Sequence, residues 1–223
     1  HLPSPAVYVP VDISREHLEQ TAIGLASDYP EIEILPVCAD FTQPFQLPRG
    51  EQAFTHTAVY FPGSTIGNFV PQQALQLLRQ IAQLADQGGG LLIGIDLQKD
   101  PAIIEAAYND APGVTAEFNL NLLRRINREL RGNFDLEQFE HQASYNGDEG
   151  RVEIYLVSRV RQTVQIGETA IEFAAGERIC TEYSHKYTID GFANLAARAG
   201  LKLRKAWTDS RRWFGVLHLI TMD

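Results

Sequence analysis

Two short stretches of this 223-residue chain gather small polar side chains in a way that suits ligand binding. The first lies between the apolar run 58–61 and the helical pattern that starts at Pro71, and it contains Gly63, Ser64, Thr65, Gly67 and Asn68. Glycines let the backbone approach a ligand closely, and a strand, a loop and a helix in this order form sites in open α/β sheets. An ordinary turn in which Asn68 caps the helix fits the same spacing.

The second stretch is 181–184, with the sequence Thr-Glu-Tyr-Ser. If it is extended, Glu182 and Ser184 point to the same face, because strand side chains repeat every two residues. A carboxylate beside a hydroxyl can bind the two ring nitrogens of an imidazole, the carboxylate as acceptor and the hydroxyl in either sense. A solvated Glu and Ser on an exposed strand is the more common origin of such a pattern.

Acidic residues follow two predicted strands near the start of the chain. The strand 6–13 has Asp12 near its carboxyl end, and the strand 31–39 is followed by Asp40 and Phe41. A carboxylate in the first position can accept hydrogen bonds from ribose hydroxyls, and an Asp beside an aromatic ring can bind adenine. Caps and Asx-turns place the same residue types in the same positions.

A third polar group begins at Tyr108 and extends to Phe118 and Asn119. Its Asn and Asp residues are also typical of a turn between helices. No Ser-His-Asp or metal-ligand pattern is visible, so neither a catalytic residue nor a metal site is predicted. Several histidines stand apart from any acid or nucleophile and receive no catalytic role: His17, His56, His141, His185 and His218.

The string PGSTIGNF at 62–69 resembles the signature loop of the histidine-specific, S-adenosylmethionine-dependent N-methyltransferases, which trimethylate the α-amine of histidine in ergothioneine biosynthesis. The resemblance implies S-adenosylmethionine as cofactor, held by Asp12, Asp40, Phe41, Gly63, Ser64 and Thr65. It implies L-histidine as substrate, with Asn68 and Tyr108 on its backbone groups and Glu182 with Ser184 on its imidazole. Tyr108 and Phe118 are candidate walls for the quaternary ammonium product.

The predicted elements follow the order of a doubly wound α/β sheet interrupted by an insertion. The first part has strands at 6–13, 31–39, 58–62 and 91–96 and helices at 14–28 and 71–87. The insertion has helices at 101–111 and 115–131, another starting within 135–142, and extended segments at 152–160, 163–167 and 170–174. A helix at 189–199 and strands at 201–206 and 214–221 complete the sheet.

We therefore expect a partial Rossmann-like class I methyltransferase domain over 1–97 and 186–223. An inserted α+β substrate-binding lobe is expected over 98–185. A glycine-rich turn after a first strand normally opens such a fold, and none precedes Asp12. The resemblance places that unit upstream, which would leave a gap between the strands at 6–13 and 58–62. The chain alone is accordingly expected to be an incomplete and inactive fragment, its sheet completed by self-association or by an upstream piece.

Composition narrows the class of partner. A net charge of −9 disfavours nucleic acid, because phosphate binding needs clustered Lys and Arg. No apolar run reaches membrane-spanning length, and no signal-peptide pattern opens the sequence. Cys38 and Cys180 are far apart, which suits a reducing cytoplasm. Two alternatives stay open: a non-catalytic ligand-binding or scaffolding module, and an N-methyltransferase of an indole amino acid. The pair Glu182 and Ser184 favours histidine over an indole amino acid as the substrate.

Overall fold

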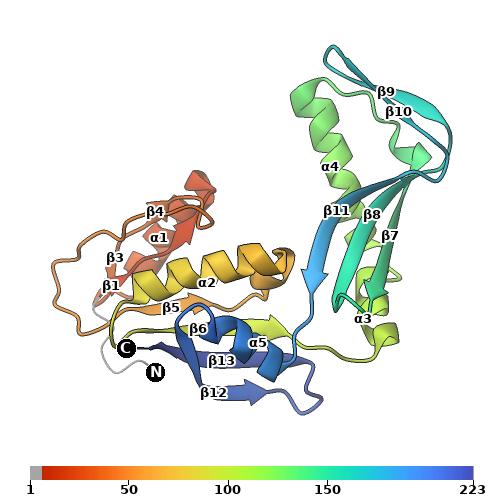
Figure 1. Cartoon of the computed structure of the whole chain (residues 1–223). Helices are drawn as coiled ribbons and strands as arrows, with labels where there is room; N and C mark the ends of the chain where they lie inside the picture. The colour runs from red at the N-terminus through yellow and green to blue at the C-terminus, as the bar shows by residue number, and fades with distance from the viewer. Residues whose placement is uncertain (1–6, 223) are drawn as a thin grey trace.

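The computed structural model describes residues 7–222 and has a central four-stranded sheet of order β12-β13-β6-β5 (Figure 1). The strand β5 (Ala58–Phe61) runs parallel to β6 (Gly90–Asp96). On the other side of β6, the strand β13 (Phe214–Thr221) is antiparallel to it and forms a hairpin with β12 (Leu201–Thr208). The two predicted closing strands are confirmed, and the sheet ends in an antiparallel pair.

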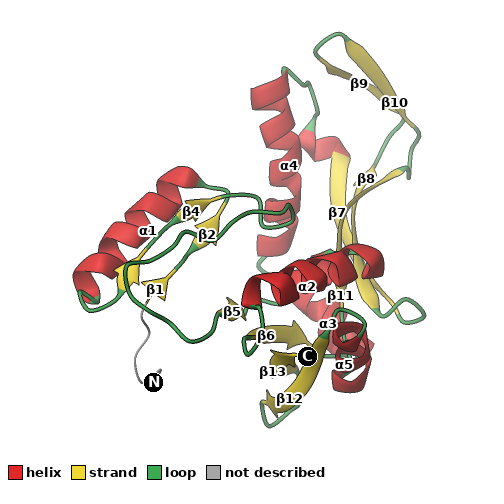
Figure 2. Cartoon of the chain, turned by 60° about the vertical axis from the view of Figure 1, so that its left-hand side comes forward, coloured by secondary structure: helices red, strands yellow, loops and turns green. Residues whose placement is uncertain are grey.

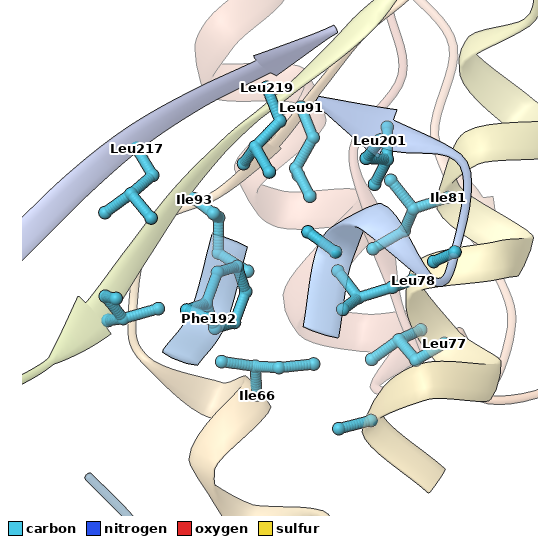
Figure 3. Close-up of a cluster of buried hydrophobic side chains, with 14 of the residues drawn as sticks. Ile66, Leu77, Leu78, Ile81, Leu91, Ile93, Phe192, Leu201, Leu217 and Leu219 are labelled. Atoms are coloured by element: carbon cyan, nitrogen blue, oxygen red, sulfur yellow. The ribbon is translucent and has the colours of Figure 1, made fainter. Parts of the chain in front are cut away.

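Two helices, α2 (Pro71–Ala85) and α5 (Ile189–Ala197), cover this sheet and join one core with it. The buried residues of α2 recur at helical spacing, so one side of the helix faces the strands. Their side chains interdigitate with alternate residues of the strands (Figure 3); the labelled core residues are Ile66, Leu77, Leu78, Ile81, Leu91, Ile93, Phe192, Leu201, Leu217 and Leu219. This core fixes the loop after β5, because Ile66 of that loop is fully buried in it.

The chain before β5 forms a separate parallel ribbon beside the helix α1 (Arg15–Asp28) (Figure 2). It comprises two short pairs, β1 (Val7–Tyr8) with β3 (Glu33–Ile34) and β2 (Val11–Asp12) with β4 (Val37–Cys38). The sequence predicts one unbroken strand at 6–13 and another at 31–39, which is wrong because each is broken into two short strands. Ala6 lies outside the described residues.

Prolines cause this interruption. Pro10 and Pro36 stand between the short strands, and neither has a backbone N–H to donate to a ladder. Hydrogen bonds from Leu35 to Tyr8 and from Val37 to Pro10, both 2.9 Å long, carry the pairing across the breaks. Among residues 7–222, no strand pairs with the edge of β5 that faces away from β6.

The second lobe rises from the carboxyl end of β6 (Figure 1). Its antiparallel sheet has the order β11-β8-β7, formed by β11 (Arg178–His185), β8 (Arg151–Ser158) and β7 (Phe139–Asn146). The helices α3 (Pro101–Tyr108) and α4 (Val114–Leu130) pack against it, and the hairpin of β9 (Gln162–Ile166) and β10 (Thr169–Phe173) extends beyond it. We propose that this lobe is the inserted unit predicted over 98–185.

The prediction of a helix starting within 135–142 is wrong. Only a short 3₁₀ turn forms there, at Leu136–Gln138, and β7 follows at once. Phe139 and Ala143 are buried and Glu140 and Gln142 are exposed, which is the alternation of a strand with one face on a core. The three extended segments predicted after it are confirmed as β8, β9 and β10.

The longest helix of the second lobe presents a charged face to solvent. On α4, Arg124 pairs with Glu117 and Arg125 pairs with Glu129, and all four side chains are largely exposed. The sequence cluster of arginines at 124–131 is thus a solvated helix face, as its interruption by Glu129 indicates. Within residues 7–222, no helix has both the length and the apolar character needed to cross a membrane.

Candidate functional site

A cavity of about 410 Å³ lies where the loop after β5, the end of β6, the helix α3 and the strand β11 meet. It is lined by Gly63, Ser64, Thr65, Asn68, Asp96, Tyr108, Glu182, Ser184, Lys186 and Phe214. The structure therefore brings together all four residues that the sequence suggested for the substrate. It adds Asp96, Lys186 and Phe214, which sequence reasoning missed.

The loop after β5 is fastened to the end of the neighbouring strand. Ser64 has left-handed backbone dihedrals (φ 57°), and its hydroxyl accepts a 2.9 Å hydrogen bond from the backbone N–H of Asp96. A 3₁₀ turn, Thr65–Asn68, follows. Val70, not Asn68, is the N-cap of α2, so the capping interpretation of Asn68 is wrong. The Asn68 side chain is exposed and has no hydrogen-bond partner within residues 7–222.

Gly67 allows β11 to approach this loop. A Cβ on Gly67 would lie 2.8 Å from the carbonyl oxygen of His185, closer than real contacts permit. The ring Nδ1 of His185 donates a 3.0 Å hydrogen bond to the carbonyl of Gly67, and the Tyr187 hydroxyl donates to the carbonyl of Ile66 at 3.4 Å. These contacts set Glu182 and Ser184 opposite the loop.

Glu182 and Ser184, near the end of β11, both line the cavity. The segment 181–184 is extended and lies within β11, whose register with β8 shifts between Cys180 and Glu182. The carboxylate of Glu182 has no hydrogen-bond partner within residues 7–222. Partial burial raises the pKa of this carboxyl, and the positive charge of Lys186 offsets part of the rise. A desolvated, unpaired acceptor facing a cavity suits a ligand N–H.

Lys186 joins the two sides of the cavity. Its side chain is 1% exposed, and its Nζ lies 2.7 Å from the hydroxyls of both Tyr108 and Ser184 and 3.0 Å from a carboxylate oxygen of Asp96. Lys99 pairs with the other oxygen of Asp96 at 2.5 Å. A buried charge is tolerated only when it is paired and hydrogen-bonded, and these contacts meet that requirement.

Sequence signals for the missed residues do exist. Lys186 continues the every-second-residue alternation that relates Glu182 to Ser184. Asp96 stands at the carboxyl end of an apolar run, the position that also draws attention to Asp12. Neither signal shows that the two residues pair with each other, because 90 positions of chain separate them.

Tyr108 is held in place from outside the cavity. His141 donates from Nε2 to the carbonyl oxygen of Tyr108 at 2.8 Å, because a carbonyl can only accept. Its Nδ1 is then the acceptor for the side-chain amide of Asn119, 3.1 Å away. His141 and His185 thus position site residues, although neither faces the cavity.

The residues suggested for the cofactor divide into two groups. Gly63, Ser64 and Thr65 line the cavity, whereas Asp12, Asp40 and Phe41 do not. Asp12 accepts from the N–H of Ser14 at 2.7 Å through one oxygen. Asp40 accepts from the N–H and the hydroxyl of Thr42 through one oxygen, at 2.9 and 2.7 Å, and these hydrogen bonds lower its pKa. The ring of Phe41 packs on Phe61 and Phe69.

The cavity wall suggested at Phe118 is wrong. That side chain lies on α4, is 69% exposed and does not line the cavity. Phe214 at the start of β13 supplies an aromatic wall instead, together with Tyr108. Within residues 7–222, no three His, Cys, Asp or Glu side chains are grouped as metal ligands would be.

The fold is similar to those of solved methyltransferase structures. A structure of an S-adenosylmethionine-dependent methyltransferase from Clostridium acetobutylicum has a TM-score of 0.50 and 11% identity, covering 96% of this chain and 75% of that chain. The CcbJ methyltransferase from Streptomyces caelestis gives a TM-score of 0.50 at 12% identity, covering 100% of this chain and 85% of that one. At such identities the likeness concerns the fold alone, which is that of class I methyltransferases.

Sequence comparison defines the family. A sequence model of the histidine-specific, S-adenosylmethionine-dependent methyltransferases matches residues 1–221, and the chain belongs to this family. It is 39% identical over 212 residues to the histidine N-alpha-methyltransferase of Mycolicibacterium smegmatis, covering 94% of this chain and 65% of that protein. It is 30% identical over 217 residues to ergothioneine biosynthesis protein 1 of Neurospora crassa, covering 96% of this chain and 24% of that protein.

Proposed function

We propose that this chain forms the histidine-binding side of an N-methyltransferase that transfers methyl groups from S-adenosylmethionine to the α-amine of L-histidine. The product would be trimethylhistidine, in ergothioneine biosynthesis. One observation carries the proposal: the carboxylate of Glu182, which has no hydrogen-bond partner within residues 7–222, and the hydroxyl of Ser184 line the same cavity as Asn68 and Tyr108. The chain spans about 65% of the length of the mycobacterial relatives that it matches, so the activity of the whole protein is part of the proposal.

In this arrangement each side chain has one task. Glu182 accepts the ring N–H of histidine, and Ser184 contacts the second ring nitrogen. Asn68 and Tyr108 contact the backbone amine and carboxylate, and the Tyr108 hydroxyl lies beside Ser184. Transfer to an amine needs alignment more than acid–base groups, so the main contribution of the site is to orient the amine and exclude water around it.

S-Adenosylmethionine supplies the electrophilic sulfonium methyl group. The residues present fit part of this cofactor. Asp12 and Asp40 lie at the carboxyl ends of the paired strands β2 and β4, and each keeps one carboxylate oxygen without a hydrogen bond from residues 7–222. Gly63, Ser64 and Thr65 would contact it from the cavity. The hydroxyl of Ser64 already accepts from the backbone N–H of Asp96, which leaves its hydrogen and one acceptor lone pair for a ligand.

We further propose that the cofactor side needs a further strand beside β5, from a second copy or from an upstream segment. Two observations support this: no strand within residues 7–222 pairs with the outer edge of β5, and Tyr60 on that strand is 63% exposed. We also place the protein in a reducing cytoplasm, which agrees with the free thiols of Cys38 and Cys180.

Calorimetric titration of the chain with L-histidine and L-tryptophan tests the substrate. We expect histidine to bind and tryptophan to bind at least tenfold more weakly, because an indole has no acceptor nitrogen. An L-tryptophan methyltransferase of Psilocybe serbica is 30% identical over 166 residues, so the indole alternative is a specific competitor. Preferential binding of tryptophan would support it, and binding of neither amino acid would favour a non-catalytic module.

A further inference from the structure

Lys186 has no part in the proposed function described so far, yet it touches two of the four proposed substrate residues. Its ammonium group is buried between β11, α3 and β6 and contacts one oxygen from each: Ser184, Tyr108 and Asp96. An ammonium has three hydrogens and no acceptor. All three hydrogens are used by these contacts, so both hydroxyl oxygens must act as acceptors toward Lys186.

The remaining hydrogens can then be counted. The hydroxyls of Tyr108 and Ser184 are 2.9 Å apart, so one donates to the other. A phenol is far more acidic than an alkyl hydroxyl and is the better donor, which favours donation from Tyr108 to Ser184. Ser184 then accepts twice, from Lys186 and from Tyr108. Both of its acceptor positions are filled, and its own hydrogen is the one left to face the cavity.

We propose that Lys186 is a specificity-determining residue that, with Tyr108, fixes Ser184 as a hydrogen-bond donor to the substrate ring. The inference rests on the proposed function. With Glu182 as acceptor and Ser184 as donor, the site takes a neutral azole ring that has one N–H and one unprotonated nitrogen. An imidazolium ring offers two N–H groups and an indole offers one N–H with no acceptor, so each leaves Ser184 without a partner.

The charged surroundings of Lys186 agree with this role. Asp96 and Lys99 lie on the β6 side, where Lys99 keeps Asp96 paired independently of Lys186. Glu182 precedes it on the same strand, and the phenols of Tyr108 on α3 and Tyr145 on β7 are further titratable groups near it within residues 7–222. Replacing Lys186 therefore leaves Asp96 with a cationic partner.

The test compares two ligands at two pH values. Histidine loses about nine-tenths of its neutral imidazole between about pH 8 and about pH 5.5, since its ring pKa is about 6.5. The matched ligand is 1,2,4-triazole-3-alanine, whose ring binds a proton only in strongly acidic solution. Protein titration, that of Glu182 included, affects both ligands alike. The measured quantity is a ratio: the fold loss of histidine affinity between these two pH values, divided by the fold loss of triazole affinity between them.

For the unchanged chain we expect this ratio to be about tenfold, and the same for Lys186→Arg, which keeps the charge and donors. Lys186→Met should lower it below about threefold, because Ser184 can then accept as well as donate. Tyr108→Phe keeps Lys186 but frees one acceptor position on Ser184, and it should also lower the ratio. Tyr108→Phe serves as the foldable alternative if thermal melting shows that Lys186→Met does not fold.

The possible outcomes distinguish failure of the proposed role of Lys186 from failure of the proposed histidine binding. A tenfold ratio that persists in Lys186→Met overturns the inference and leaves histidine binding intact. A ratio lowered by Lys186→Met but unchanged in Tyr108→Phe also overturns it, since direct repulsion of the imidazolium would then explain the selectivity. If the unchanged chain binds neither ligand, the proposed function fails, and the inference fails with it.

Discussion

The substrate side of the cavity and the N-terminal ribbon are built in different ways. On the substrate side, contacts join residues far apart in sequence, such as Ser64 with Asp96 and His185 with Gly67. On the ribbon, the carboxylates of Asp12 and Asp40 accept hydrogen bonds, among residues 7–222, only from groups two residues away. The helix beside the ribbon is also less firmly packed than the helix on the central sheet: α1 buries two side chains, whereas α2 buries six.

This difference indicates which half of the site is ready to bind. Long-range contacts hold side chains in place without a ligand, so little ordering remains to be done when histidine binds. Local turns fix a carboxylate relative to its own loop but not relative to a distant partner. We therefore expect histidine binding to be strong and cofactor binding to be weak in the chain by itself, and each prediction below tests one side of this contrast.

The largest expected effect is loss of activity in the chain alone. In the proposed arrangement the ribbon would contact one side of the cofactor only, and each missing tenfold of affinity corresponds to about 1.4 kcal/mol. Incubation with S-adenosylmethionine and histidine should give no trimethylhistidine above background by mass spectrometry, although calorimetry shows histidine binding. Steady product formation by a monodisperse monomer would refute the contrast.

Replacing Glu182 by Ala should weaken histidine binding by about 1–3 kcal/mol, because a desolvated ring N–H would lose its acceptor. Calorimetric titration measures the change. Glu172→Ala, an exposed carboxylate on β10, is the matched control and should leave the affinity unaltered. An unchanged affinity in the Glu182 variant would remove this residue from the site.

Gly67→Ala tests the contact that joins β11 to the loop. The added methyl group would meet a backbone oxygen 2.8 Å away, so the loop or the strand must move. We expect a loss of about 1–2 kcal/mol in the free energy of unfolding, with weaker histidine binding. Gly24→Ala on α1 adds a methyl group in open space and should leave histidine binding as it was. Equal behaviour of the two variants would show that the contact does not hold the site together.

Asn68→Ala should lower histidine affinity by about 1 kcal/mol and leave the melting temperature within a few degrees, because this exposed side chain has no hydrogen-bond partner among residues 7–222. Calorimetry and thermal melting give the two values. A large fall in melting temperature would return Asn68 to a structural role.

The central sheet and its helices were predictable from apolar periodicity and length, whereas the breaks in the ribbon required attention to Pro10 and Pro36. The strand β7 was missed because its alternation is carried by few apolar residues, and Phe139 and Ala143 become informative only against the rest of their core. For the site, the face shared by Glu182 and Ser184 follows from strand geometry. The hydrogen bonds of Lys186 do not, since they join three elements that only the tertiary fold brings together.

The smallest expected effect concerns the pH dependence of stability. Burial raises the pKa of the Glu182 carboxyl above its unfolded value, so the folded state binds more protons than the unfolded state in the range just above that value. Stability conferred by this group therefore falls as pH rises through that range, and it is regained as pH is lowered. Glu182→Gln removes the titration, so its melting temperature should exceed that of the unchanged chain near neutral pH, and the gap should close in acid. Arg151 and Glu153, which form an ion pair on β8, are not replaced in this variant, so their titration cancels in the difference between the two melting temperatures. A gap that widened in acid would mean that Glu182 is stabilised as the anion, and its proposed availability to a ligand N–H would then be lost.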